Sequence, residues 1–231
     1  MKLGYFRLDT KPGVDIVRGE DKLINAMVEE WHYIHRKRQG RSIGYWVTLD
    51  HEIVGAVLYN DICVPYPKYR DYMELSRYYL HPDIQGGTVT DSKGKTHTYP
   101  IASRSIGLSL KQLLIDFVRE CPHRVPIYGI ISWSDNTMFD GTIYKAINCV
   151  LDNPNAAGPT SRESMGKPTH EDYHRSKTRW VYTYSKKYRN KIIRNYGREN
   201  PSDYQDSLQH GKRVIRSECE GGAFRQIQLT V

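Results

Sequence analysis

Residues 102–119, ASRSIGLSLKQLLIDFVR, are the stretch that decides the fold. Large apolar side chains recur in it at helical spacing and form one stripe, made of Ile106, Leu110, Leu113, Leu114 and Phe117. Ser103 is available as the N-cap, because its side-chain oxygen can accept a hydrogen bond from a first-turn N–H group. We therefore expect a long amphipathic helix that begins near Ala102.

The chain before this helix predicts strands and one shorter helix. Runs of β-branched and aromatic residues predict strands at 2–8, 43–49, 53–59 and 73–81. The two middle runs flank Asp50-His51-Glu52, which is typical of a hairpin. A first helix is expected from Glu20, where apolar residues recur at helical spacing, to the aromatic and basic run at 31–38, before Gly40 and Arg41 break the pattern. Residues 82–100 are polar and glycine-containing, so we expect an inserted loop or small flap there.

The chain after the helix continues the alternation of strands and helices. We expect a buried strand at 125–133, a short helix at 141–150, an exposed loop at 152–172, a strand at 178–184 and edge strands beyond 213. This order predicts an α/β (α+β) fold with a central mixed sheet flanked by helices. We predict one domain over residues 1–231, with a core at 1–151 and an extended basic C-terminal region at 173–231.

Composition narrows the class of partner. Lys and Arg exceed Asp and Glu by 34 to 26, a formal charge of +8, so the surface should attract polyanions such as nucleic acid or cofactor phosphates. The four cysteines are widely spaced, which favours neither a zinc ribbon nor a disulfide framework. His32 and His35 are too few ligands to predict a metal site. The N-terminus has no signal pattern, and a cytoplasmic location is expected.

The start of the long helix has a pattern suited to phosphate. A helix start exposes unpaired N–H groups and the positive end of the dipole. The turn Arg104-Ser-Ile-Gly107-Leu-Ser109 resembles the Arg/Gln-x-x-Gly-x-Gly/Ala signature with which the GNAT acyltransferase superfamily binds acetyl-coenzyme A, with Ser109 at the last small position. That resemblance implies an acetyl-CoA or related CoA thioester bound by Arg104, Ser105, Ile106, Gly107, Leu108 and Ser109. The alternative is an ordinary capped helix whose Gly107 only permits close packing.

Strand 73–81 contains a charged pair, Glu74 and Arg77. Because side chains alternate along a strand, we expect these two to face opposite ways, with Arg77 on the side of Tyr79. Arginine there would offer a bidentate fork to a phosphate or carboxylate. The alternative is an exposed ion pair.

The end of strand 125–133 offers a second set of reactive groups. Ligands of open α/β sheets lie at the carboxyl ends of strands, where Asp135 follows Ser132-Trp-Ser. Tyr144, in the next predicted helix, could act as an acid with Asp135 as base. The alternative is that Asp135 and Asn136 cap a turn and Tyr144 belongs to the core.

These motifs together resemble the bacteriophage Mom-type DNA modification proteins, a GNAT-like family. The matching motifs are Glu-Leu-Ser-Arg, the Ser-Arg helix start, the Ser-Asp strand end and Gly-Thr-Ile-Tyr-Lys-Ala-x-Asn, within about residues 31–150. The family converts adenine in DNA to a carbamoylmethyl-adenine, which protects phage DNA from restriction. The resemblance implies functional positions at Arg77, Ser103, Asp135, Tyr144 and Tyr33.

Base modification also requires stacking and phosphate contacts. An extruded base needs aromatic side chains and a basic rim. Candidate stacking residues are Trp31, Tyr33, Tyr45 and Trp46, and candidate rim residues are Arg36, Lys37, Arg38 and Arg41, with a further cluster at Lys186, Lys187 and Arg189. The alternative is that the tryptophans are core residues and the charges are solvated.

Three functions follow from these observations. The first is an enzyme that modifies adenine in double-stranded DNA with a CoA-type cofactor. The second is an N-acetyltransferase for a small-molecule or protein amine, which would not need the basic aromatic run at 31–41. The third is a DNA-binding protein without catalytic activity.

Overall fold

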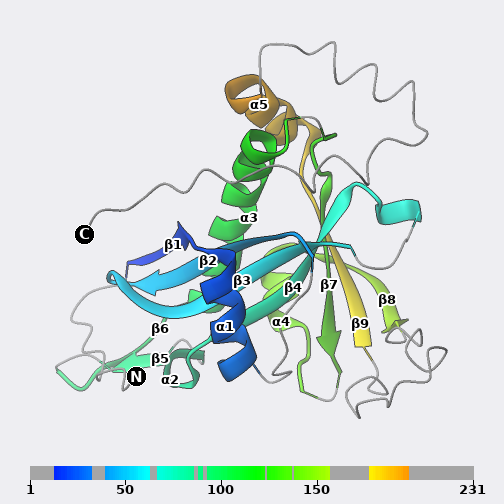
Figure 1. The fold of residues 1–231 in the computed structure, drawn as a ribbon. Helices are drawn as coiled ribbons and strands as arrows, with labels where there is room; N and C mark the ends of the chain where they lie inside the picture. Colours follow the sequence, from blue (N-terminus) through cyan, green and yellow to red (C-terminus); the bar gives the residue numbers. More distant parts are fainter. Residues whose placement is uncertain are drawn as a thin grey trace.

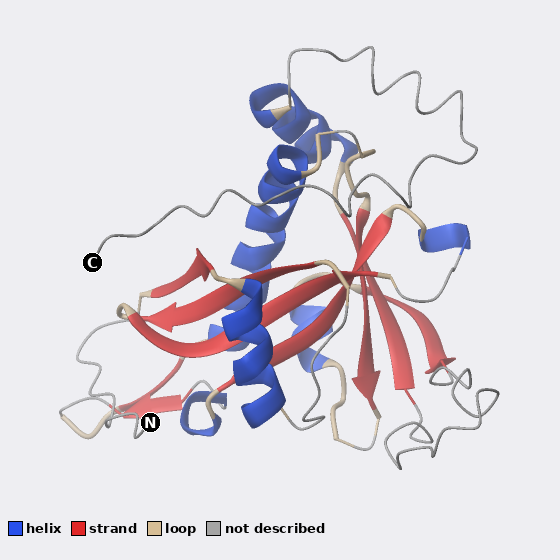
Figure 2. Cartoon of the chain, viewed as in Figure 1, coloured by secondary structure: helices blue, strands red, loops and turns tan. Residues whose placement is uncertain are grey.

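The computed structural model describes residues 13–32, 40–62, 67–85, 88–90, 93–122, 124–136, 138–156 and 177–197. Its strands are β1 (Val14–Arg18), β2 (Ser42–Leu49), β3 (Glu52–Asp61), β4 (Tyr72–Leu80), β5 (Thr88–Thr90), β6 (Thr96–Thr98), β7 (Gly129–Asp135), β8 (Val150–Ala156) and β9 (Lys177–Thr183). Its helices are α1 (Asp21–Trp31), the short 3-10 helix η1 (Pro67–Tyr69), α2 (Pro82–Gln85), α3 (Ile101–Glu120), α4 (Thr142–Ala146) and α5 (Lys186–Tyr196). Figures 1 and 2 show their arrangement.

Seven strands form one mixed sheet in the order β1-β2-β3-β4-β7-β9-β8. Neighbours from β1 to β4 are antiparallel, β4 and β7 are parallel, and β9 is antiparallel to both β7 and β8. Helices cover both faces of this sheet, so the predicted central mixed sheet flanked by helices is confirmed (Figure 2).

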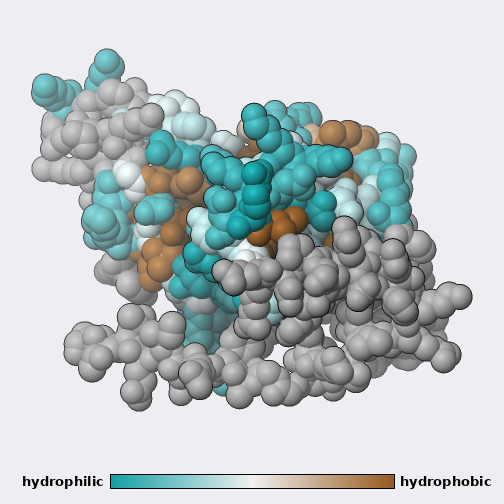
Figure 3. Space-filling model, turned by 90° about the horizontal axis from the view of Figure 1, so that it is seen from above, coloured by the Kyte–Doolittle hydropathy of each residue, from teal (hydrophilic) through white to brown (hydrophobic). Residues whose placement is uncertain are grey.

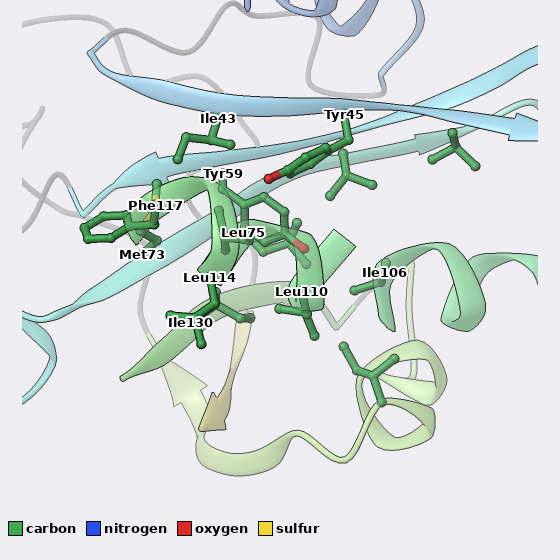
Figure 4. Packing of buried hydrophobic residues seen from close by; sticks show 14 of the residues in the cluster. Ile43, Tyr45, Tyr59, Met73, Leu75, Ile106, Leu110, Leu114, Phe117 and Ile130 are labelled. Carbon is green, nitrogen blue, oxygen red and sulfur yellow. The ribbon is translucent and has the colours of Figure 1, made fainter. Parts of the chain in front are cut away.

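Two helices cover opposite faces of the β1–β4 half of the sheet (Figure 1). On the α3 face, the apolar stripe of α3 packs on strand residues such as Ile43, Tyr59, Met73 and Ile130 (Figure 4). On the α1 face, a smaller cluster joins Ile24, Val28, Ala56 and Leu58. Burial of both stripes therefore fixes β2 and β3 between two layers of helix.

Most predicted elements are confirmed, including the hairpin, the first helix, the long helix and the strands near 73–81 and 178–184. The buried strand starts later than predicted, at Gly129, since the preceding segment contains Pro126, which cannot donate to a ladder. The predicted loop at 82–100 instead contains α2 and the β5–β6 hairpin.

The predicted helix at 141–150 is wrong in its second half. α4 ends at Ala146, because Asn148 adopts a left-handed conformation with φ of 62°, and β8 begins at Val150. Strand β8 also replaces the start of the predicted loop at 152–172. The predicted strands at 2–8 and beyond 213 lie outside the described residues, as does most of that loop. The single-domain prediction extends over such residues and stays a prediction.

Candidate active site at the strand divergence

Strands β4 and β7 pair only briefly and then separate. Their ladder joins Tyr72–Glu74 to Gly129–Ile131, after which β4 continues along β3 and β7 continues along β9. We call the point after Glu74 and Ile131 the strand divergence (Figure 1). Beyond this point, β4 and β7 no longer form a ladder with each other among the described residues.

On the α3 face, two hydroxyl groups meet at the strand divergence. The buried Ser132 Oγ donates to the Leu75 carbonyl at 2.9 Å and lies 3.0 Å from the phenol oxygen of Tyr144. Ser132 and Leu75 are the first residues of β7 and β4 beyond the shared ladder. Tyr144 of α4 therefore contacts β7 at the strand divergence, through the Ser132 hydroxyl.

Neighbouring side chains fix the ring of Tyr144. It stacks on Trp180 of β9, with centroids 5.6 Å apart and planes 9° apart, and Trp180 Nε1 donates to Ser134 Oγ at 2.9 Å. Gly141 precedes α4 with φ of 76°, and a Cβ there would lie 2.2 Å from the Trp180 ring. A glycine is thus needed for α4 to approach Trp180. These contacts restrain the ring of Tyr144, whereas its hydroxyl hydrogen can still rotate toward another acceptor.

The beginning of α3 lies on the same face, along β4. Tyr78 of β4 and Ser105 of α3 join their hydroxyl groups at 3.1 Å. The α3 N-cap is Pro100, without a side-chain cap, so the prediction of Ser103 as N-cap is wrong. Ser103 instead donates its hydroxyl to the Pro100 carbonyl at 3.3 Å. Ala102 and Ser103 occupy the second and third positions of α3, so no preceding turn of the helix supplies acceptors for their N–H groups. These N–H groups lie at the positive end of the helix dipole.

The cofactor segment 104–109 proves to lie inside the helix, which corrects the prediction that it forms the helix start. The Arg104 N–H donates to the Pro100 carbonyl at 2.9 Å, and later N–H groups belong to the helical ladder. Ser105, Ile106 and Ser109 are buried in the core, while Leu108 is half-buried and Arg104 is exposed. Ser105, Ile106 and Ser109 therefore cannot face a ligand in this conformation.

Gly107 differs from these buried neighbours. A Cβ added at Gly107 would meet no described atom within 4 Å. The alternative, that this glycine is needed for close packing, is therefore wrong as far as the described residues go. Gly107 lies one turn after Ser103 on α3. An open surface thus extends from the first-turn amides along this side of the helix.

On the α1 face, a β-bulge brings Glu74 and Arg77 to the same side of the sheet. Glu74 pairs with Asn60, and Arg77 pairs with Leu58, because the register shifts between Leu58 and Tyr59. The prediction that the two charges face opposite ways is therefore wrong: the extra residue, Ser76, breaks the alternation. Arg77 shares this face with Tyr79, as predicted, and its Nη1 donates to the Ser76 carbonyl at 2.6 Å.

Asp135 lies on the α1 face as well. The β7 ladder with β9 is regular, so Asp135 alternates with Ser134 and Ser132, which face α4. The Asp135 side chain is buried, at 2% exposure. Asp135 and Tyr144 thus lie on opposite faces of the sheet, not side by side as an adjacent acid and base at one strand end would require.

The predicted DNA-contacting residues are scattered. Tyr45 is fully buried and donates to Asp116 Oδ2 at 2.8 Å, and burial raises its pKa, so it cannot stack on a base. Trp46 packs half-buried near α1, whereas Trp31 is 45% exposed. Arg41 lies over the Phe117 ring and donates to Cys121 Sγ. Tyr33, Arg36, Lys37 and Arg38 lie outside the described residues.

Helix α5 carries the second basic cluster at the far end of α3. Lys186 and Lys187 are exposed, but Arg189 donates to the Pro126 carbonyl at 3.0 Å and lies 3.8 Å from the centroid of the Tyr128 ring. Arg189 therefore holds α5 to the segment before β7, in place of the predicted nucleic-acid contact. Figure 3 looks onto the end of the molecule where α5 lies and shows mainly hydrophilic residues at its centre.

A charged cluster around Asp152 was not predicted. Asp152 of β8 accepts hydrogen bonds from Lys68, Tyr69 and Arg179 at 2.9, 2.5 and 2.7 Å. Burial raises its pKa, but these donors outweigh burial and hold the pKa at about 2. Its members come from three distant segments, so no spacing in the sequence signals the cluster.

Other candidate chemistry receives no support within the described residues. No group of three or more potential metal ligands occurs in the described part of the chain. Cys121 and Cys149 are buried, and burial raises the pKa of both thiols, that of Cys149 to about 12, which disfavours the nucleophilic thiolate. Across the described ranges, no helix has the length and apolar character needed to cross a bilayer.

Comparisons with known proteins give distant structural likenesses. No family model matches the chain, and no curated protein matches it. Among solved structures, it is similar to a chimera of the spermidine N-acetyltransferase SpeG from Vibrio cholerae (TM-score 0.45, 9% identity, 78% of this chain and 98% of that one). It is also similar to the alpha-N-protein acetyltransferase RimL in complex with coenzyme A (TM-score 0.43, 12% identity, 76% and 96%).

A third similar structure is an IAA acetyltransferase from Bacillus cereus (TM-score 0.41, 12% identity, 74% of this chain and 100% of that one). Similarities of this size are too low to carry an argument about activity. The candidate site therefore rests on its own geometry.

Proposed function

We propose that this protein is an N-acyltransferase that uses a CoA thioester. The observation that carries the proposal is the arrangement at the strand divergence. The Tyr144 phenol contacts β7 and the beginning of α3 contacts β4, both on the same face of the sheet. Such a site combines an anion-binding helix end, a separation of two central strands and a proton donor. Acyl transfer from a phosphate-bearing thioester uses all three.

The residues present fit a CoA-type cofactor. The first turn of α3 contains no acidic residue, its N-cap provides no side-chain acceptor, and Arg104 is exposed nearby. Ala102 and Ser103 N–H groups would hold the diphosphate, with Arg104 adding charge. The free space at Gly107 lets a ligand approach the helix backbone. This assignment retains Ser103, Arg104 and Gly107 from the predicted set and leaves out the three buried residues.

The opposite positions of Asp135 and Tyr144 suit a transfer through the strand divergence. A bound CoA thioester supplies an activated acyl carbonyl and a thiolate leaving group. We assign Asp135 to take a proton from the acceptor amine on the α1 face as the carbon–nitrogen bond forms, and Tyr144 to give its phenol proton to the sulfur as the carbon–sulfur bond breaks. Arg77 and Glu74 on the α1 face would orient the acceptor.

The acceptor is proposed to be an amine of a small molecule or protein. A second candidate, the exocyclic amine of adenine in double-stranded DNA, is favoured by the net charge of +8 and by the resemblance of residues 135–148 to Mom-type proteins. The two acceptors share the site but differ in what must bind the α1 face. Tyr33 and residues 36–38 matter only for the second candidate.

Three measurements test the proposal. Thermal unfolding with acetyl-CoA tests the cofactor, because a ligand at 100 times its Kd adds about 2.7 kcal/mol to the folded state. Transfer from acetyl-CoA to a panel of amines tests the first acceptor. Mass spectrometry of nucleosides from cells that express the protein, beside an Asp135→Ala control, tests the second. A chain that neither binds acetyl-CoA nor modifies either acceptor contradicts the proposal.

A further inference from the structure

We propose that Ser132 is a positioning residue that sets the direction of the Tyr144 hydroxyl and stabilises it after proton transfer. This inference rests on the proposed function, since it assigns a task to the same phenol. The juxtaposition is a chain of three groups at the strand divergence: the Tyr144 phenol, the Ser132 hydroxyl and the Leu75 carbonyl.

The direction of the hydrogen bonds follows from the number of hydrogens. The Leu75 carbonyl can only accept, so the single Ser132 hydroxyl hydrogen goes to it at 2.9 Å. At the 3.0 Å contact with Ser132 Oγ, the hydrogen must then come from Tyr144. Before reaction the phenol proton is thus held at the divergence by Ser132, and it turns from this hydrogen bond to the sulfur as the carbon–sulfur bond breaks.

The same serine can support the phenol in both of its protonation states. When Tyr144 gives its proton to the leaving sulfur, its oxygen becomes negatively charged and needs a donor. A rotation of the Ser132 hydroxyl turns the hydrogen from the Leu75 oxygen to the phenolate oxygen without moving a heavy atom. The charge is then stabilised until Tyr144 regains a proton, and the Ser132 hydrogen returns to Leu75. A charge-assisted hydrogen bond of this kind is stronger than a neutral one.

The structure also contains a matched pair with a purely structural role. In the core, Tyr59 lies 2.7 Å from Ser109 Oγ, which donates to the Ile106 carbonyl at 2.9 Å. Both residues are fully buried between the sheet and α3. The chemical groups are the same in the two chains, but only Tyr144 is half-buried and reaches the divergence. Ser109→Ala is therefore the control for Ser132→Ala.

The first arm of the test needs no enzymatic activity. We would label tyrosine with ¹³C at Cζ, assign Tyr144 and Tyr59 with phenylalanine variants, and compare the two alanine variants. Ser132→Ala should change the ¹³Cζ chemical shift of Tyr144 but not that of Tyr59. Ser109→Ala should change the chemical shift of Tyr59 but not that of Tyr144. An unmoved Tyr144 resonance in Ser132→Ala overturns the hydrogen-bond chain.

The second arm separates positioning from folding. In acetyl transfer, Ser132→Ala should lower kcat about tenfold or more with little change in the KM for acetyl-CoA, because a misdirected phenol affects the transition state more than binding. Ser109→Ala should lose thermal stability but keep kcat. Wild-type kcat in Ser132→Ala overturns the positioning role. No transfer by the wild type overturns the proposed function, while the resonance arm still decides the hydrogen-bond chain.

A further variant guards against a folding defect in Ser132→Ala. Ser132→Cys keeps a weak donor for Leu75 but offers the phenol a much poorer acceptor. We expect it to fold and to show the same Tyr144 resonance shift and reduced kcat. Wild-type values for both quantities would contradict the proposal.

Discussion

The two halves of the sheet differ in how their residues are packed. Strands β1–β4 lie between α1 and α3, and β2 and β3 are buried along almost their whole length. Strands β7, β9 and β8 end in an exposed edge, where Val150 is 69% exposed, and they carry the polar contacts of Ser132, Ser134 and Asp152. A tightly packed half can hold a polar half in place, because its burial does not depend on the polar contacts. Substitutions in the two halves should therefore affect different quantities.

The largest effect is expected from the packed half. Phe117→Ala removes a side chain that is 1% exposed, packs in the α3 core and lies beneath the guanidinium groups of Arg41 and Arg124. The free energy of unfolding should fall by about 3–5 kcal/mol. Denaturant unfolding measures this change. At a temperature where the variant is folded, kcat should stay near the wild-type value, and a large loss of kcat would break the comparison between the halves.

The next effect concerns the polar half and should appear in catalysis. Tyr144→Phe removes the proposed proton donor and should lower kcat about a hundredfold, or about 2.7 kcal/mol of activation free energy. Stability should change by only about 1 kcal/mol, because the phenol's hydrogen bond to Ser132 is lost. Initial rates and thermal unfolding measure the two quantities. Unchanged kcat would remove Tyr144 from the mechanism.

The Asp152 cluster should make stability depend on acidity. Its pKa of about 2 in the folded protein lies below the ordinary value of 3.8, so its contribution is complete above about pH 5 and is lost as pH falls toward 2. The loss should be about 2 kcal/mol of unfolding free energy. Unfolding midpoints from pH 5 to pH 2 measure it against Asp152→Asn, which should show a shallower decline. Parallel curves for the two proteins would show that Asp152 does not contribute.

The smallest effect sharpens the assignment of the cofactor surface. Gly107→Ala should stabilise the protein by about 0.5–1 kcal/mol, since alanine is the better helix former and its methyl group meets no described atom within 4 Å. If the cofactor passes close to this backbone, the same variant should bind acetyl-CoA more weakly by calorimetry. Tighter or equal binding would place the cofactor elsewhere, and Ser109→Ala provides a control in the same helix.

Regular periodicity was predictable from the sequence, whereas departures from it were not. The stripe from Ile106 to Phe117 predicted α3, and the alternation around Asp50-His51-Glu52 predicted the β2–β3 hairpin. The same alternation rule placed Glu74 and Arg77 on opposite faces, because a bulge depends on the partner strand and leaves no local signal. The N-cap was missed for a similar reason: Ser103 bonds backward to Pro100 in the folded helix.

The sequence proposes a set of site residues but could not predict their geometry. Tyr144 contacts Ser132 at the strand divergence, whereas Asp135 lies four residues beyond Ile131 along β7, and the sequence could not place Asp135 and Tyr144 on different faces. The sequence marks Ser132 only as part of a strand end, although its hydroxyl contacts that of Tyr144. Of the predicted cofactor residues, burial excludes those on the core side of α3.

The amino-acid sequence by itself determined the long helices and strands whose apolar side chains recur regularly, and which of their faces avoid water, because these properties follow from local spacing. The tertiary structure alone decided which polar groups meet. Those meetings depend on the bulge in β4, the separation of β4 from β7 and the register of β9, each of which is set by packing between segments far apart in the chain.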